Sequence, residues 1–200
     1  FNHLNLRTSS RVLVPLCGIS IDMIWLARQG YDVVGVELVE TAVQEFFSEQ
    51  NITPTITEFT SAADQFPLKR YQGQLAGQTI TLWAADIFVL TPKDIGPIDA
   101  VYDRAALIAL PADMRPNYSE QIRELTNNAP QLLITLNYDQ SKKDGPPFSV
   151  SSDQIQQYYG DHYQVHQLKN EPTIIRSAPE IRVAEHVWLL NIANDSREPS

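Results

Sequence analysis

The sequence is poor in cysteine and lacks any cluster of histidines, and both absences argue against particular classes of protein. Its 200 residues contain a single cysteine, which cannot form a disulfide bond within the chain. The four histidines, His3, His162, His166 and His186, are scattered without the spacing that metal ligands require. We therefore expect neither a disulfide framework nor a metal site.

Clustered positive charge and long apolar runs are also missing. Lys and Arg number 15 against 24 Asp and Glu, and the net charge of −9 argues against a nucleic-acid partner. No stretch approaches about 18 uncharged apolar residues, and no signal peptide is visible, so we expect a cytoplasmic protein without a membrane span. The hydrophobic fraction of 43% is that of an ordinary globular chain.

The length fits one domain over residues 1–200. The chain starts at Phe1 without a methionine, only ten residues before the first apolar run, so we expect that a segment upstream is missing. Residues 194–200 are polar and are expected to form a disordered tail.

The most informative stretch is residues 11–37, RVLVPLCGISIDMIWLARQGYDVVGVE. Residues 12–16 form an apolar run typical of a strand that is buried on both faces. Ser20 is a good helix N-cap, and Gly30 stands where a helix ends in the left-handed region. Residues 31–36 are rich in strand-forming residues again. The pattern predicts a βαβ unit with two parallel strands.

Glu37 falls at the carboxyl end of the second predicted strand, 19 residues after Gly18. A carboxylate at this spacing is positioned to accept both hydroxyls of a ribose. The turn at residues 15–20 has one glycine where a dinucleotide fingerprint has three, which argues against a bound pyrophosphate. We therefore predict S-adenosylmethionine, held by the turn backbone and by Glu37. The alternative is that Glu37 is only a solvated residue at a strand end.

Two later strand ends extend this predicted site. Asp86 follows the strand at residues 80–84 and could accept the exocyclic amine of adenine, while Ile87 packs on the ring. Arg104 follows the strand at residues 98–102 and could brace a carboxylate or a developing negative charge. As alternatives, Asp86 only forms a turn, and Arg104 pairs with Asp103 at the surface or begins a helix.

The remaining pattern predicts an α/β protein with a doubly wound, Rossmann-like fold. Its mostly parallel seven-stranded sheet ends in an antiparallel C-terminal hairpin. We expect an irregular insertion with short strands at residues 52–75 and, at the second helix, a capping box of Thr41 and Gln44. The expected strands are 12–16, 31–36, 80–84, 98–102, 131–138, 163–168 and 185–190, and the expected helices are 21–29, 41–50, 105–110, 113–127 and 151–159.

Several runs occur in an order that is more specific than a generic nucleotide turn. They are RVLVPLCG at 11–18, DMIWLARQGYDVVGVEL at 22–38, YDRAALIALPADMR at 102–115, LLITLNYDQ at 132–140 and GPPFSV at 145–150. On these runs, which span most of the domain, the chain resembles the bacterial branch of the thiopurine S-methyltransferase family.

This resemblance implies a single class I, S-adenosylmethionine-dependent methyltransferase domain. The implied reaction moves a methyl group to the sulfur of an aromatic or heterocyclic thiol, and in bacteria also to selenium or tellurium species. The implied partner is a small-molecule thiol, and the implied state is a monomer. The positions that match the family's cofactor contacts are Leu16, Gly18, Glu37, Asp86, Ile87 and Arg104.

The resemblance assigns catalytic positions to Arg104 and, through a looser match, to Arg182 on the substrate side. It also shows two departures. Ile19 stands where bacterial relatives usually carry lysine, and the tryptophan-bearing N-terminal segment that folds over the cofactor is not in this sequence. Two other readings stay open: a degenerate protein that binds the cofactor without methylating thiols, and a nicotinamide-dependent oxidoreductase.

Overall fold

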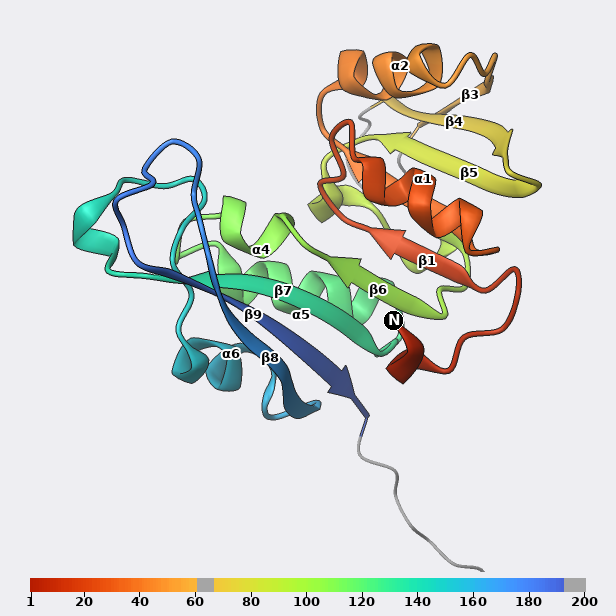
Figure 1. The fold of residues 1–200 in the computed structure, drawn as a ribbon. Helices are drawn as coiled ribbons and strands as arrows, with labels where there is room; N and C mark the ends of the chain where they lie inside the picture. Colours follow the sequence, from red (N-terminus) through yellow and green to blue (C-terminus); the bar gives the residue numbers. More distant parts are fainter. Residues whose placement is uncertain (61–66, 193–200) are drawn as a thin grey trace, which may run out of the picture.

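A computed structural model describes residues 1–60 and 67–192 of the chain (Figure 1). Its centre is one nine-stranded sheet with the strand order β3-β4-β5-β2-β1-β6-β7-β9-β8. The tail expected to be disordered, residues 194–200, lies outside the described residues. The strands are β1 Arg11–Val14, β2 Asp32–Glu37, β3 Thr55–Thr60, β4 Pro67–Leu75, β5 Gln78–Ala84, β6 Ala100–Asp103, β7 Gln131–Asn137, β8 Gln164–Thr173 and β9 Val183–Asn191.

The five central strands of the sheet, β5, β2, β1, β6 and β7, run parallel. An antiparallel pair flanks them on each side, β3–β4 on one side and β9–β8 on the other. All seven strands expected from the sequence are present in this sheet. The doubly wound α/β fold with an antiparallel C-terminal hairpin is confirmed, and its parallel strands all end at one edge.

The expectation of an irregular insertion with short strands at residues 52–75 was wrong only about the irregularity. Residues 61–66 lie outside the described residues, and on either side of them β3 and β4 pair as a regular antiparallel ladder. Strand β4 pairs along its length with β5, from Lys69 opposite Ala84 to Leu75 opposite Gln78. Its polar sequence gave a weak strand signal. The pairing with an apolar neighbouring strand supplies the stability that the local pattern lacks.

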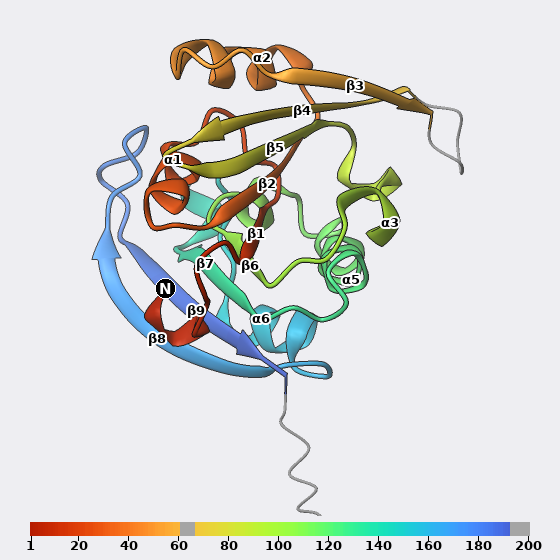
Figure 2. The same ribbon diagram turned by 90° about the vertical axis from the view of Figure 1, so that its right-hand side faces the viewer.

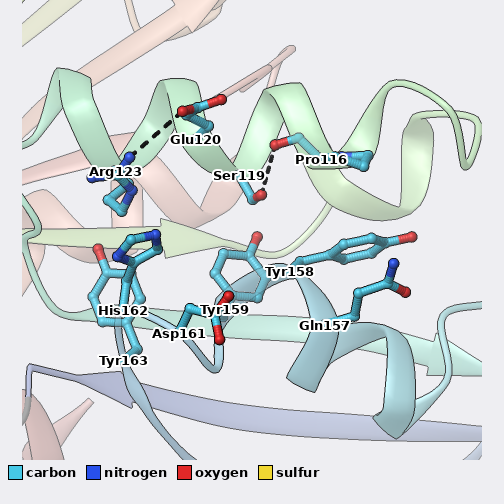
Figure 3. A pocket seen from close by; sticks show the side chains of 10 residues that line it. All are labelled: Pro116, Ser119, Glu120, Arg123, Gln157, Tyr158, Tyr159, Asp161, His162 and Tyr163. Carbon is cyan, nitrogen blue, oxygen red and sulfur yellow. Dashed lines mark hydrogen bonds and ion pairs between the residues drawn. The ribbon is translucent and has the colours of Figure 1, made fainter.

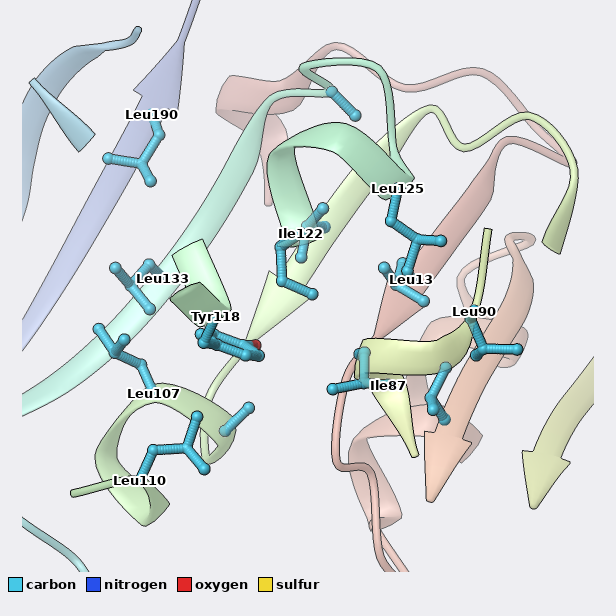
Figure 4. Packing of buried hydrophobic residues seen from close by; sticks show 14 of the residues in the cluster. Leu13, Ile87, Leu90, Leu107, Leu110, Tyr118, Ile122, Leu125, Leu133 and Leu190 are labelled. Atoms are coloured by element: carbon cyan, nitrogen blue, oxygen red, sulfur yellow. The ribbon is translucent and has the colours of Figure 1, made fainter. Parts of the chain in front are cut away.

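Helices cover both faces of the sheet (Figure 2). Buried side chains of α1 and α2 pack on one face, and those of α4, α5 and α6 pack on the other. On the face covered by α4, α5 and α6, Tyr118 and Ile122 of α5 lie over Leu13 of β1 and Leu133 of β7 (Figure 4). The helices are α1 Ile21–Arg28, α2 Glu40–Glu49, α3 Pro92–Ile95, α4 Ala106–Ala109, α5 Arg115–Leu125 and α6 Ser152–Tyr159, and the short 3-10 segments are η1 Asn2–Leu4, η2 Ile87–Val89 and η3 Gln140–Lys142.

The ends of α1 are those expected from the sequence. Ser20 is the N-cap residue, and its hydroxyl accepts a hydrogen bond from the amide of Asp22 at 3.1 Å. Gly30 follows the helix with a φ of 90°, a conformation that glycine adopts without steric cost. These local signals place the helix directly after the turn that ends β1.

The predicted capping box of Thr41 and Gln44 is absent from α2. The helix begins one residue earlier, at Glu40, and its N-cap residue Val39 makes no side-chain cap. Glu40 instead accepts a hydrogen bond from the ammonium group of Lys69 on β4 at 2.8 Å. A tertiary ion pair, which local spacing cannot reveal, therefore fixes this helix start.

No helix in residues 1–60 and 67–192 combines the length and the apolar character needed to cross a membrane.

Candidate active site

The turn after β1 has an unusual backbone. Both Leu16 and Gly18 are in the left-handed region, with φ of 44° and 51°. This conformation costs a branched residue such as Leu roughly 1 kcal/mol, so the surroundings must hold it. They do so through two hydrogen bonds to β2, from the amide of Cys17 to the carbonyl of Val36 and from the amide of Gly18 to the carboxylate of Glu37, both at 2.9 Å.

Glu37 therefore lies against the turn, as its spacing from Gly18 predicted. One carboxylate oxygen accepts from Gly18 and the other from the amide of Val39 at 2.9 Å. Each oxygen keeps a lone pair for a ribose hydroxyl. A Cβ added to Gly18 would meet nothing within 4 Å, so there is open space beside the turn. The turn and the carboxylate fit the ribose and the methionine part of S-adenosylmethionine.

Asp86 is exposed at the end of β5, where an adenine contact was predicted. One of its oxygens accepts a hydrogen bond from the amide of Phe88 at 3.0 Å and so begins η2. The side chain of Ile87 is 4% exposed and packs into the core (Figure 4). The next residue, Phe88, is 36% exposed and is the more accessible apolar side chain.

Leu38 is a candidate that the sequence reasoning missed. It directly follows Glu37, its side chain is 67% exposed, and it lines a cavity of about 500 Å³ together with Asp86 and Lys69. The available signal in the sequence was an apolar residue next to Glu37, the carboxylate that is predicted to bind the ribose. Its exposure could not be read from the sequence, because an apolar residue at a strand end is equally compatible with core packing.

Arg104 pairs with Asp22, and not with Asp103 as one alternative had it. Its Nη1 donates to both carboxylate oxygens of Asp22, at 3.0 and 2.9 Å. Asp22 raises the pKa of this guanidinium, through a hydrogen bond and its opposite charge. Since Asp22 lies in the first turn of α1, the ion pair brings the end of β6 to the turn that follows β1.

Asp103 has a different environment, because its side chain is only 2% exposed. It accepts hydrogen bonds from the amides of Ala106 and Leu107, at 2.9 and 3.3 Å, and from the hydroxyl of Tyr118 at 2.7 Å. Burial raises the pKa of this carboxyl to about 6, although the three hydrogen bonds act in the opposite direction. Asp103 therefore anchors the start of α4 to the end of β6.

Arg182 is exposed and immediately precedes β9. It lines a cavity of about 560 Å³ with Asn137, which is at the end of β7 opposite Ala184 of β9. The residue thus shares the sheet edge with Arg104. Strand β7 separates β6 from β9, and both Asp103 and Trp188 lie opposite Leu133 of β7. Arg182 comes six residues before Trp188, so it lies farther along the sheet than Arg104, and the two residues are roughly 20 Å apart.

A groove rich in aromatic side chains opens beside the ion pair. It has a volume of about 520 Å³, and Trp25 and Tyr102 line it together with Asp22. Burial, with the negative charge of Asp22, raises the pKa of Tyr102 to about 12, so its hydroxyl stays protonated at neutral pH. The sequence reasoning missed both aromatic residues, because each belongs to an otherwise ordinary core pattern.

Cys17 does not provide a nucleophile despite its place in the turn. Burial, and then the charge of Glu37, raise the pKa of its thiol, so the thiolate is not formed at neutral pH. Within the described residues, no group of three or more His, Cys, Asp or Glu side chains could hold a metal ion.

A separate cavity of about 260 Å³ lies between α5 and α6, and none of the predicted site residues line it (Figure 3). The side chains of Arg123, Tyr159 and His162 line this cavity. The buried hydroxyl of Tyr159 has no hydrogen-bond partner among the described residues.

Comparisons with known proteins identify the family of this chain. A family model described as thiopurine S-methyltransferase matches residues 1–191. A thiopurine S-methyltransferase from Psychrobacter cryohalolentis is 60% identical over 191 residues, which cover 96% of this chain and 86% of that protein. One from Xanthobacter autotrophicus is 40% identical, with the same two coverages.

Among solved structures, a SAM-dependent methyltransferase from Methanosarcina mazei has the same fold. It superposes with a TM-score of 0.67 at 11% identity and covers 96% of both chains. The magnesium protoporphyrin IX methyltransferase of Synechocystis, solved with bound SAM, superposes with a TM-score of 0.54 at 19% identity, covering 90% of this chain and 70% of that one.

Proposed function

We propose, from the premise that this chain belongs to the thiopurine S-methyltransferase family, that it transfers a methyl group from S-adenosylmethionine to the sulfur of an aromatic or heterocyclic thiol. The observation that carries this proposal is the ion pair between Arg104 and Asp22. It joins a guanidinium at the end of β6 to the helix that starts after the Gly18 turn. A cation is thereby held beside the predicted cofactor site.

S-adenosylmethionine, when bound, supplies a methyl group on a positively charged sulfur that a thiolate can attack in line. The chain's own task is then to bind and orient. Glu37 would hold the ribose hydroxyls, Asp86 would accept the adenine amine, and the backbone at Leu16 and Gly18 would border the methionine part. Within this proposal, Asp22 has a carboxylate that suits a cofactor ammonium group.

Arg104 has the chemistry needed to favour the thiolate. Its guanidinium is always protonated near neutral pH, and its side chain is 51% exposed, so it can reach a ligand. An opposite charge nearby lowers the pKa of a thiol. Because heterocyclic thiols already ionise near neutrality, no dedicated base is required, and the thiol proton leaves to solvent.

The groove beside Trp25 and Tyr102 is the acceptor surface that we propose. Flat aromatic rings suit a flat aromatic thiol, and Asp22 links the groove to Arg104. Arg182 is proposed to act on the substrate side from the start of β9. We further propose that the protein acts as a monomer in the cytoplasm and without a nucleic-acid partner, which its net charge of −9 supports.

Replacing Arg104 with alanine tests the catalytic role. Turnover of an aromatic thiol should fall by about 10- to 100-fold, the effect of losing a charge-assisted contact, while the affinity for S-adenosylhomocysteine is largely kept. Arg182→Ala should mainly raise the KM for the thiol. Arg123→Ala, a change on α5 away from the strand ends, is the control. Unchanged turnover in Arg104→Ala would remove Arg104 from the mechanism.

A second measurement separates the enzyme from its alternatives. In a thermal-shift experiment, S-adenosylhomocysteine should raise the melting temperature of the protein and NAD should not. In an activity assay, the protein should transfer the labelled methyl group of S-adenosylmethionine to members of a panel of thiols, selenite and tellurite. Binding of the cofactor without methylation of any acceptor would instead indicate a degenerate cofactor-binding protein. Stabilisation by NAD would indicate a nicotinamide-dependent enzyme.

A further inference from the structure

Arg115, the first residue of α5, is a buried cation with a side chain held in place on two sides. It is 2% exposed. Its Nε donates to the carbonyl of Leu110 at 2.9 Å, and its Nη1 donates to the carbonyl of Ser149 at 3.3 Å. The guanidinium carbon lies 5.7 Å from the centre of the Phe148 ring. These contacts clamp the segment after β7 onto the start of α5.

The charge of Arg115 has no counter-ion in the part of the chain that the structure describes, since no carboxylate there lies within ion-pair distance of it. A buried charge is costly unless it is paired. The hydrogen bonds of Arg115 to Leu110 and Ser149 use its Nε and Nη1, while its Nη2 donates to no described residue. Nη2 is also not among the fully enclosed unpartnered atoms, so it reaches a surface.

That surface is a cavity of about 550 Å³, and Arg115 is one of its lining residues. Most of its other lining residues come from the end of β7, the segment before α6, and the first turn of α6. Gln154 of α6 also lines it, and only its Oε1 is engaged, by the amide of Ser151 at 2.9 Å. Its Nε2 is therefore a second uncommitted donor, next to a helix N-terminus that favours negative charge.

The start of α6 lies next to the same space, because its N-cap residue Ser151 lines the cavity. The amides of Ser152 and Asp153 follow Ser151 and have no partner within the helix. Asp144 is the one acidic side chain among the lining residues. An uncommitted guanidinium nitrogen, an amide group and a helix N-terminus make several donors for one ligand. Several donors match a phosphoryl group, which offers three acceptor oxygens, better than a single carboxylate.

We propose that this cavity, which shares no residue with the predicted cofactor site, binds a phosphoryl group, either of free phosphate or of a small phosphate ester. Arg115 supplies the charge, and Gln154 with the start of α6 supplies further hydrogen bonds. The cavity volume leaves room for the organic part of a small phosphate ester.

Titration calorimetry with inorganic phosphate tests the site. Replacing Arg115 itself could unfold the segment that it holds, so two variants at other lining residues are used instead. Gln154→Glu preserves the capping box but adds a negative charge, and should weaken phosphate binding at least about tenfold. Asp144→Asn removes the negative charge and should tighten binding several-fold. Gln157→Glu and Asp161→Asn make the same charge changes outside this cavity and should have little effect.

Glycerol 3-phosphate and acetate complete the experiment. Glycerol 3-phosphate should bind at least as well as phosphate if the ligand is a phosphate ester, and less well if the ligand is free phosphate. Either result supports a phosphoryl site. Acetate should bind more weakly than both. No phosphate binding at about 10 mM, or binding that Gln154→Glu and Asp144→Asn leave unchanged, would overturn the proposal.

Discussion

At the scale of single residues, Asp103 and Arg104 are neighbours with opposite surroundings. The carboxylate is buried among Tyr118 and two backbone amides, and the guanidinium is half-exposed against Asp22. The first residue anchors the chain, and the second is free to meet a ligand. The roles divide where β6 ends, because the start of α4 holds Asp103 and Asp22 of α1 holds Arg104.

Asp103 makes the stability of the protein depend on pH. Its pKa is raised from 3.8 to about 6 by burial, so its protonated form is favoured in the folded state. The stabilisation is fully present below about pH 4 and is lost as the pH rises through about 6. The pKa shift limits the resulting loss in the free energy of unfolding to about 3 kcal/mol. In Asp103→Asn this pH-dependent contribution should vanish when urea unfolding is measured from pH 4 to 7.

Tyr118→Phe provides the matched comparison. The Tyr118 hydroxyl lowers the pKa of Asp103 by its hydrogen bond, so its removal should raise that pKa further and move the loss of stability to higher pH. If the wild type and Asp103→Asn have parallel stability profiles over this range, Asp103 does not titrate in the way its burial implies.

At the scale of elements, the β1–α1–β2 unit packs most closely at Gly35 of β2. A Cβ at this position would lie 2.5 Å from a methyl carbon of Leu82, 2.9 Å from the sulfur of Cys17 and 3.3 Å from the sulfur of Met23. All three neighbours are buried. The glycine therefore allows α1 and β5 to approach β2, and it sets the position of the turn at Cys17.

Gly35→Ala should destabilise the protein by about 1–3 kcal/mol, because a filled core has no room for another methyl group. Urea unfolding of the variant measures this cost. Gly77→Asn is the control, since a Cβ there meets nothing within 4 Å and asparagine tolerates the positive φ of 82°. A change within about 0.5 kcal/mol for Gly35→Ala would mean that its neighbours can move aside.

At the scale of the whole molecule, one continuous sheet connects the two antiparallel flanks. Trp83 of β5 and Trp188 of β9 lie in different halves of this sheet and are 2% and 4% exposed. The indole of Trp188 donates to the hydroxyl of Thr135 at 2.9 Å. Because backbone hydrogen bonds run from strand to strand across the sheet, we expect residues 1–200 to unfold as one domain.

Two double variants test this expectation with single fluorescent reporters. The pair Trp25→Phe and Trp188→Phe leaves Trp83, and the pair Trp25→Phe and Trp83→Phe leaves Trp188. In each protein, the fluorescence transition in urea should coincide with the loss of far-ultraviolet circular dichroism. Separate midpoints within either protein would show that the two halves of the sheet unfold independently, and so would contradict a single domain.

How much was predictable differs between the elements. The β1–α1–β2 unit followed from local chemistry, since an apolar run, Ser20, Gly30 and the position of Glu37 each act within a few residues. The hairpin β3–β4 did not, because Lys69 and its neighbours form a strand through pairing with β5. The start of α2 failed for the same reason, as Glu40 binds across to β4 and displaces the expected cap.

The candidate site divides in the same way. The sequence by itself determined the βαβ unit, the single-glycine turn and the strand-end residues Glu37, Asp86 and Arg104, because strand direction brings the carboxyl ends of parallel strands to one edge. Only the tertiary structure decided that Arg104 pairs with Asp22, 82 residues away, and that Leu16 is in the left-handed region. Both depend on the order of strands in the sheet and on their close approach, which no local pattern encodes.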